Sequence, residues 1–213
     1  VYPLPHMEVI KDLVPDLTEI FVRRAAIERR GQDLAQGVRG SLSVAATPPL
    51  CDGFVVNAVA RFLRSRPDVR VSIQATPSSM VVDRIISGEV DAGVVYGPVL
   101  SAAVQVEEIG SASIGCLVPA RHRLARRPSV TVKDLEGERL ISYLPQALLR
   151  PYIDRVMAGA PFAPTVQTGA SSTAIALVME GVGVALVESA LVQARPQRGL
   201  VLVPVTPDTG LKV

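Results

Sequence analysis

Apolar residues recur every three or four positions through the first part of the chain, from Val9 to Leu34, with charged residues between them. This spacing predicts an amphipathic helix. Pro15 should kink or divide the helix, and Gly37 and Gly40 should end it. The apolar stripe could lie on the protein's own core or pair with another chain. Its near-heptad spacing favours pairing with another chain.

Beyond this helix, short strand-like runs alternate with segments of helical spacing. The alternation of apolar and polar residues at 69–75 is typical of a half-buried strand. A strand–helix–strand–helix–strand order predicts a parallel sheet with helices on its faces. The expected strands are 42–46, 69–75 and 91–96, and the expected helices are 54–65 and 80–87.

The second half of the chain repeats this alternation of strands and helices less regularly. We expect two α/β lobes, with the chain crossing between them near 111–114. A basic loop at 121–128 and a helical turn at 132–135 follow the crossing. The expected strands are one or two within 107–118 and others at 140–143, 165–168, 184–187 and 200–205, and the expected helices are 147–158, 174–180 and 189–193.

Composition narrows the class of protein. The 213 residues are 48% apolar and 20% charged, which is typical of a soluble globular protein. The longest uninterrupted apolar run, Ala174–Met179, is far shorter than the ~20 residues of a membrane helix, so we expect a cytoplasmic protein without a membrane partner. The net charge of +2 does not indicate a whole-surface nucleic-acid binder. Cys51 and Cys116 are far apart in sequence, so we expect no disulfide framework and no cysteine-based metal site. We also expect no other metal and no cofactor.

Three clusters rich in Ser, Thr and Pro follow predicted strands, at 47–49, 76–79 and 168–173. The carboxyl ends of parallel strands meet at one edge of a sheet, where ligands bind. Each cluster also precedes a helix, whose free backbone N–H groups suit a carboxylate or phosphate. The other interpretation is that these residues are ordinary helix caps and first residues of helices. Three clusters at one edge favour a small anionic ligand.

Two further residues belong to the same predicted edge. Tyr96 could stack on a ligand or hydrogen-bond to it, or it could be a core aromatic whose hydroxyl reaches water. Glu188 could bind an amine or guanidinium, although a solvated residue or a helix cap is the more common role. Cys51 is best interpreted as a small buried thiol. The candidate ligand-binding residues are Thr47, Pro48, Pro49, Leu50, Ser78, Ser79, Tyr96, Gly97, Ser171, Ser172 and Glu188.

The patterns of common catalytic sites are missing from the sequence. There is no Gly-x-Ser-x-Gly elbow and no phosphate-binding loop, and neither His6 nor His122 is placed to activate a serine. Glu107 and Glu108 would face opposite sides of a strand and could not share a proton. The arginines of the basic loop lack interleaved aromatic residues, so we interpret the loop as solvated rather than as a nucleic-acid site. We expect no catalytic residues.

Six short strings in a fixed order carry a resemblance to a known family. They are Gly40–Ala46, Phe62–Val69, Gly88–Gly93, Pro119–Ala125, Val132–Gly137 and Glu180–Ala185. Together they resemble the effector-binding part of LysR-type transcriptional regulators, with Arg123 where the family has proline. The stretch Pro77–Met80, followed by Tyr96–Pro98, is most similar to the branch that senses octopine, nopaline and related amino-acid derivatives.

The resemblance implies a fold and its domains. It implies two Rossmann-like lobes of the type II periplasmic-binding-protein kind, preceded by a linker and dimerisation helix at 1–39. The first lobe would contain 40–110 and 206–213, and the second 111–205. The family's N-terminal winged helix-turn-helix would be absent from this chain.

The resemblance also implies a function. A small effector, an amino acid or opine-like carboxylate, would bind between the lobes and change DNA binding through the linker helix. Implied partners are this effector, further copies in a dimer or tetramer paired through 9–34, 54–65 and 147–158, and promoter DNA contacted by the missing domain. A free-standing solute-binding protein of the same fold would need a signal peptide. A two-lobe α/β enzyme would need a titratable group of residues in its cleft.

Overall fold

The computed structural model describes residues 20, 24, 27–28, 31 and 40–213. Most of the predicted N-terminal helix, with Pro15 and Gly37, lies outside the described residues. The five residues described there are helical. Arg24 Nε donates a hydrogen bond to Glu28 Oε1 one turn away, at 2.8 Å. Ile20 and Ile27 are 60% and 68% exposed. These two apolar side chains are seven residues apart, the spacing of a heptad.

The chain divides into two compact units. The first unit contains the chain up to Cys51, then Val55–Val95 and Val99–Val106. The second contains Glu107–Val213 together with two short segments, Asp52–Phe54 and Tyr96–Pro98. The predicted boundaries, including the return of 206–213 to the first lobe, stay predictions.

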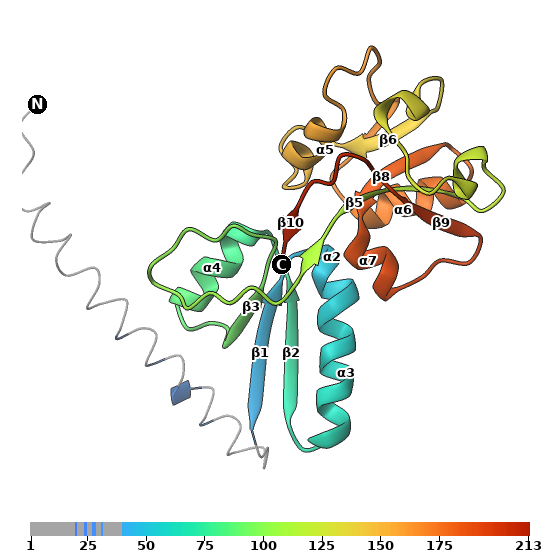
Figure 1. The fold of residues 1–213 in the computed structure, drawn as a ribbon. Coiled ribbons are helices and arrows are strands. Elements are labelled where there is room, and N and C mark those ends of the chain that lie inside the picture. The colour runs from blue at the N-terminus through green and yellow to red at the C-terminus, as the bar shows by residue number, and fades with distance from the viewer. Residues whose placement is uncertain (1–19, 21–23, 25–26, 29–30, 32–39) are drawn as a thin grey trace, which may run out of the picture. The chain divides into compact units, whose positions relative to one another are not determined.

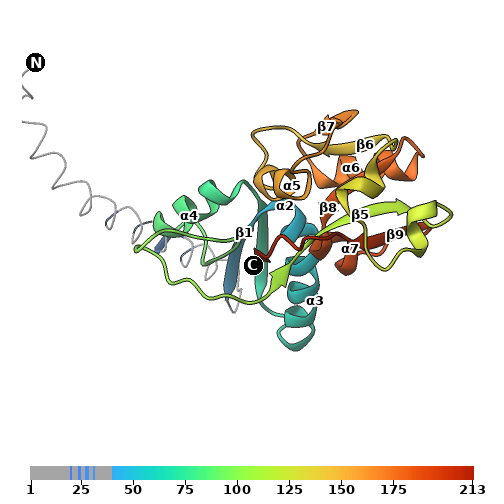
Figure 2. The same cartoon turned by 45° about the horizontal axis from the view of Figure 1, so that its top comes forward.

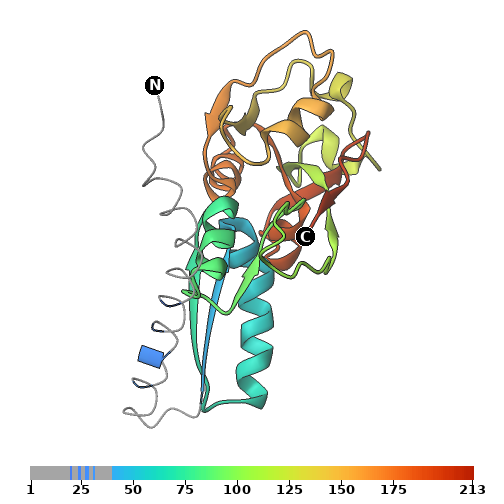
Figure 3. The same ribbon diagram turned by 90° about the vertical axis from the view of Figure 1, so that its left-hand side faces the viewer.

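The first unit is built on a three-stranded parallel sheet in the order β2-β1-β3, which confirms the predicted strand–helix–strand pattern. Successive residues of β1 point to opposite faces. Val44 and Ala46 pack with Cys51 and Val55 beneath α3. Ala45 packs on the other face with Val81 of α4 and with Val90, which follows this helix. The two helices thus cover opposite faces of the sheet (Figures 1 and 3). The elements are β1 (Ser41–Ala46), α2 (Pro48–Leu50), the π-helix η1 (Cys51–Val55), α3 (Val56–Ser65), β2 (Arg70–Ala75), α4 (Ser78–Ile86) and β3 (Ala92–Val94).

Both helices of this unit begin earlier than the sequence pattern predicts. Helical structure runs without a break from Pro48 to Ser65, because a proline fits the first turn of a helix, where its missing N–H is not needed. The second helix begins at Ser78 rather than Met80. The third strand ends at Val94, so Tyr96 lies beyond the strand that was expected to include it.

The second unit contains a five-stranded sheet in the order β7-β6-β8-β5-β9 (Figure 2). Strands β6, β7 and β8 are parallel, and β5 is antiparallel to both β8 and β9. The buried face of α6 packs on β5, β6 and β8. The elements are β4 (Ser111–Ala112), β5 (Ile114–Pro119), β6 (Leu140–Tyr143), α5 (Arg150–Val156), β7 (Val166–Thr168), α6 (Ser171–Met179), β8 (Val184–Glu188), α7 (Ser189–Ala194), β9 (Leu200–Pro204) and β10 (Leu211–Lys212), with 3-10 helices η2 (Arg123–Arg126) and η3 (Val132–Leu135).

Two expectations for this unit were wrong. The basic segment is not an irregular loop, because η2 forms within it. Glu107 and Glu108 lie before the first strand of this region rather than in it, so the argument from strand alternation does not apply to them. The Glu108 carboxylate instead accepts a hydrogen bond from Lys212 Nζ at 2.7 Å. The extended structure begins at Ser111, beside the first buried residue, Ala112.

Candidate functional site

Two of the predicted polar clusters lie at the carboxyl edge of the first unit's sheet. Thr47 follows β1, and its N–H donates to the carbonyl oxygen of Val94 at 3.1 Å. Thr76 follows β2, and its N–H donates to the carbonyl oxygen of Ala46 at 2.9 Å. These bonds hold the ends of the three strands together. The buried Thr47 hydroxyl has no hydrogen-bond partner among the residues that the structure describes.

Ser78 occupies the first turn of α4, at this same edge. The cap position belongs to Pro77, and Ser78 is the first helical residue, a place that the alternative interpretation as an ordinary cap or first-turn residue also allows; no side chain caps the helix. Its Oγ is shielded from solvent and forms no hydrogen bond within the described part of the chain. Ser79 and Pro48 are exposed, Pro49 is half-buried, and Leu50 is a buried core residue.

The carboxyl edge of the second unit's sheet holds a buried triangle of oxygen atoms. Tyr143 ends β6, Glu188 ends β8, and Ser171 is the first residue of α6. The Tyr143 hydroxyl lies 2.6 Å from Ser171 Oγ and 3.0 Å from Glu188 Oε2. Ser171 Oγ lies 3.0 Å from the same carboxyl oxygen. The exposed fractions of Tyr143 and Glu188 are 2% and 0%. Three segments distant in sequence thus meet at one carboxyl group.

Burial controls the ionisation of this group. Removal from water raises the pKa of Glu188 to about 7, although hydrogen bonds from its own backbone N–H and from the two hydroxyls oppose the rise. Burial also raises the pKa of Tyr143 and of Tyr96, and the negative charge of Glu188 adds to both shifts. Both tyrosines therefore keep their protons at neutral pH.

Two atoms of this cluster are left unsatisfied. Glu188 Oε1 and the Tyr96 hydroxyl are both buried, and neither has a hydrogen-bond partner among residues 40–213. The expectation that Glu188 is solvated or caps a helix was wrong, because its side chain is fully buried and makes no cap bond to α7. The expectation of a Tyr96 hydroxyl in water was also wrong. A buried polar atom without a partner is costly, so these two atoms mark a place where a ligand could supply the missing bond.

The remaining predicted residues of this unit have different surroundings. The N–H of Gly97 donates to the carbonyl oxygen of Lys212 at 3.0 Å, and its carbonyl oxygen accepts from the Tyr152 hydroxyl at 2.9 Å. Ser172 is exposed. Tyr143 was missed by the sequence analysis, although its place at the end of a predicted strand was a usable signal.

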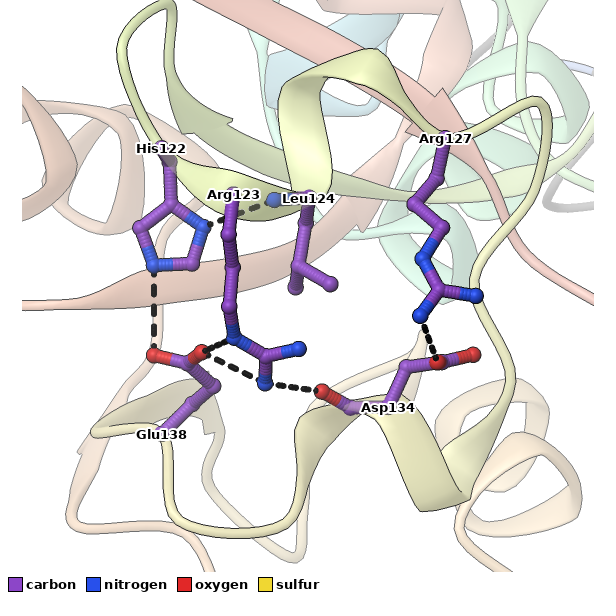
Figure 4. Close-up of polar contacts among 6 residues, drawn as sticks. All are labelled: His122, Arg123, Leu124, Arg127, Asp134 and Glu138. Atoms are coloured by element: carbon purple, nitrogen blue, oxygen red, sulfur yellow. Dashed lines mark hydrogen bonds and ion pairs between the residues drawn. The ribbon is translucent and has the colours of Figure 1, made fainter.

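The basic segment forms an internal brace (Figure 4). Arg123 Nε donates to Glu138 Oε1 at 2.8 Å, and Arg123 Nη2 donates to the carbonyl oxygen of Asp134 at 2.7 Å. Arg127 forms an ion pair with the Asp134 carboxylate at 3.3 Å. These contacts tie η2 to η3. Arg123 and Arg127 therefore hold two segments of the unit together. The prediction that this loop is only solvated was incomplete.

His122 completes this brace (Figure 4). Its Nδ1 accepts a hydrogen bond from the N–H of Leu124 at 3.3 Å, and its Nε2 lies 3.2 Å from Glu138 Oε2. Both contacts are satisfied when the neutral ring carries its proton on Nε2. Hydrogen bonds from the Thr131 backbone and hydroxyl lower the pKa of Asp134, and burial opposes them. The cluster is a structural one.

The described residues contain neither a group of metal ligands nor a membrane-spanning helix. In the part of the chain that the structure describes, no three His, Cys, Asp or Glu side chains are grouped as metal ligands would be. Across the same residues, no helix combines the length and apolar character needed to cross a membrane.

Solved structures define the class of fold. The chain matches the effector-binding domain of BenM with its effector benzoate at a TM-score of 0.66, with 18% identity and 82% of each chain covered. It matches a full-length OxyR from Pseudomonas aeruginosa at a TM-score of 0.71, with 18% identity, covering 92% of this chain and 67% of that one. The chain therefore has the two-lobe α/β fold of effector-binding domains, related to periplasmic binding proteins.

Sequence comparison gives the family. Residues 35–212 match the model of the LysR substrate binding domain, and the chain belongs to this family. The octopine catabolism/uptake operon regulatory protein OccR of Rhizobium meliloti is 30% identical over 178 residues, which are 84% of this chain and 59% of that protein. The regulatory protein NocR of Agrobacterium tumefaciens is 29% identical over 164 residues, 76% of this chain and 55% of that protein. The chain thus spans a little over half the length of these relatives.

Proposed function

We propose that this chain is the effector-binding and oligomerising region of a transcriptional regulator, and that its effector is a small carboxylate derived from an amino acid. The family and its regulatory relatives support the first part of this proposal. The observation that carries the second part is the pair of sheet edges described above. Among the described residues, each unit has a buried polar atom without a partner at the carboxyl ends of its strands, Thr47 Oγ1 and Ser78 Oγ in the first unit and Glu188 Oε1 in the second.

The chemistry of the first unit's edge suits the carboxylate of such an effector. The N–H groups of the first helical turn of α4 lack partners within the helix. The Ser78 hydroxyl adds a donor without adding charge. The positive end of the helix dipole favours an anion at this position.

Self-association and DNA binding complete the proposed function. Ile20 and Ile27, exposed and seven residues apart on helical backbone, support pairing of the N-terminal helix with a second copy. DNA would be contacted by another part of the full-length regulator. A solute-binding protein and an enzyme are not favoured, because the relatives are transcriptional regulators.

The Ser78→Asp and Ser78→Asn variants test the proposed carboxylate site. The probes are a panel of amino acids and their N-carboxyalkyl derivatives, including octopine, screened by thermal shift and measured by calorimetry. The two variants have nearly the same shape and differ in one negative charge. In a poorly screened site, this charge repels a ligand carboxylate. We expect Ser78→Asp to weaken binding at least tenfold more than Ser78→Asn, since about 1.4 kcal/mol of repulsion is enough.

Two results would contradict the proposal. If a panel member binds and both variants bind it like the parent, the carboxylate does not dock at α4. If no member of the panel stabilises the parent chain, the proposed class of effector is wrong.

A further inference from the structure

The buried triangle at the end of β8 has a property that the proposed function does not require. Its three oxygen atoms make three mutual contacts, of 2.6, 3.0 and 3.0 Å. Each contact needs one proton to be a hydrogen bond rather than a repulsion between lone pairs. The hydroxyls of Tyr143 and Ser171 supply two protons. The third contact is satisfied only when the Glu188 carboxyl group carries a proton.

We propose that Glu188 holds a proton in the ligand-free protein and gives it up when the cationic side-chain group of the effector, an ammonium or guanidinium, binds to its Oε1. This inference rests on the proposed function, because it assigns a nitrogen of an effector of the proposed class. In the step, the nitrogen keeps its protons and donates a hydrogen bond to Oε1, the O–H bond of the carboxyl group breaks, and the proton passes to solvent. Below pH 7, up to one proton is released for each ligand bound.

The unsatisfied atom decides which kind of ligand group fits. In a triangle with three protons, Glu188 Oε1 is the carbonyl oxygen of the acid, which can only accept a hydrogen bond. It has no partner among residues 40–213. A ligand carboxylate offers no proton to this atom, whereas an ammonium or guanidinium offers several. The subsite therefore differs in chemistry from the one at α4.

Among the residues that the structure describes, none forms an ion pair that would balance the charge of this carboxyl group. Tyr143 approaches it from β6, Ser171 from α6, and the charge of Glu188 acts on Tyr96. Ile114 of β5 lies opposite Glu188 in the strand register. No ion pair to Glu188 forms within the described part of the chain, and Arg150, which contacts the Tyr143 carbonyl oxygen, is paired with Asp154 at 2.6 Å.

Burial without a counter-charge explains both states of this group. A buried carboxylate without a cation is unstable, so the free protein keeps the acid neutral. Burial raises the pKa of Glu188 to about 7, which places the change in ionisation near neutral pH. A bound cation supplies the missing charge and makes the carboxylate the stable form. Below pH 7 the binding of a cationic ligand then competes with a proton.

Calorimetry with a matched pair of probes tests this inference on the whole chain. The probes are octopine, which carries a guanidinium, and its citrulline counterpart, which carries a neutral ureido group in the same place. The variants are Glu188→Gln and, as a control, Glu180→Gln at an exposed position. Titrations at pH 6, 7 and 8, each in two buffers of different ionisation enthalpy, count the protons released.

Three results together are expected. The affinity of the parent and of Glu180→Gln for octopine should rise about tenfold from pH 6 to pH 8, the limit for one competing proton with a pKa near 7. Up to one proton should be released at pH 6, and the citrulline probe should bind more weakly without proton release. Glu188→Gln should lose both the pH dependence and the preference for octopine, while its melting curve shows that it is folded.

The other outcomes overturn the inference in distinguishable ways. Equal binding of the two probes, or octopine binding without proton release, shows that Glu188 is not the cation subsite but leaves the proposed function standing. Binding of panel members that lack a cationic side chain, with no binding of octopine or arginine, has the same meaning. If no carboxylate binds at all, the proposed function fails and this inference fails with it.

Discussion

Replacing Glu188 by glutamine should change how the stability of the protein depends on pH, even without a ligand. Burial raises the pKa of Glu188 from 4.5 to about 7, so the folded chain holds this proton more tightly than the unfolded chain does. The stability gained because the folded chain binds this Glu188 proton more tightly is fully present below pH 4.5 and is lost as the pH rises through 7. Such a rise in pKa corresponds to about 3 kcal/mol in the free energy of unfolding.

Most of this change should fall in an accessible range of pH. Between pH 5 and pH 8 the parent should lose about 2 to 3 kcal/mol relative to Glu188→Gln, which cannot ionise. The glutamine has nearly the same shape and can donate from its amide where the acid donates its proton. At any single pH, the difference in free energy of unfolding between the parent and Glu188→Gln also depends on how well the amide fits. The prediction therefore concerns how this difference changes with pH.

Urea unfolding at pH 5, 6, 7 and 8 measures this difference. Glu180→Gln is the control, the same substitution at an exposed glutamate. The histidines are common to all three proteins, so their titration cancels in the comparison. Parallel stability curves for the parent and Glu188→Gln would refute the reasoning. A parent that gains stability over Glu188→Gln as the pH rises would show that the folded site prefers the ionised carboxylate.

Three further predictions concern other parts of the chain. In Gly183→Ala, the new Cβ would meet the backbone oxygen of Arg139, so urea unfolding should show a loss of about 3 kcal/mol in the free energy of unfolding. Gly181 has a positive φ of 73° and open space around it, so Gly181→Ala should lose only about 1 kcal/mol. Equal losses would contradict this. Glu138→Gln should lower the free energy of unfolding by about 1 to 2 kcal/mol, because its partly buried ion pair with Arg123 is lost, and an unchanged value would contradict the brace. Light scattering should report at least a dimer for the 213-residue chain at micromolar concentration and a smaller species for a chain that begins at residue 40. A monomeric 213-residue chain would contradict the pairing of the N-terminal helix.

The order of elements could be predicted from the sequence because periodicity is a local property. The alternation at β2 and the buried run of β6 were recognisable without knowledge of their neighbours. Helix starts were less predictable. Pro48 reads as a break in a one-dimensional pattern, yet it opens a helix, because the first helical turn needs no N–H at that position. In the next helix the proline, Pro77, lies at the cap position itself, and Ser78 is the first helical residue.

Part of the candidate site could be predicted from the sequence, because the order of the strands indicates which strand ends lie together. The rule that parallel strands end at a common edge correctly placed Thr47 beside the ends of its neighbouring strands and directed attention to Glu188. The burial of Glu188 could not be predicted, because it depends on partners 17 and 45 residues away in sequence, Ser171 and Tyr143. A glutamate followed by a serine at a strand end is locally indistinguishable from a solvated one.

The second unit is assembled from three separate stretches of chain, and this limits how the gene can be rearranged. Its short contributions are Asp52–Phe54 and Tyr96–Pro98, both embedded in sequence that otherwise builds the first unit. Gly53 packs within 3.1 Å of the Ala194 side chain, where a larger residue would not fit without adjustment. A recombination breakpoint near residue 107 would therefore separate the second unit from Tyr96, part of its own candidate site. Chimeric sensors made from two relatives should exchange residues 40–213 as one block.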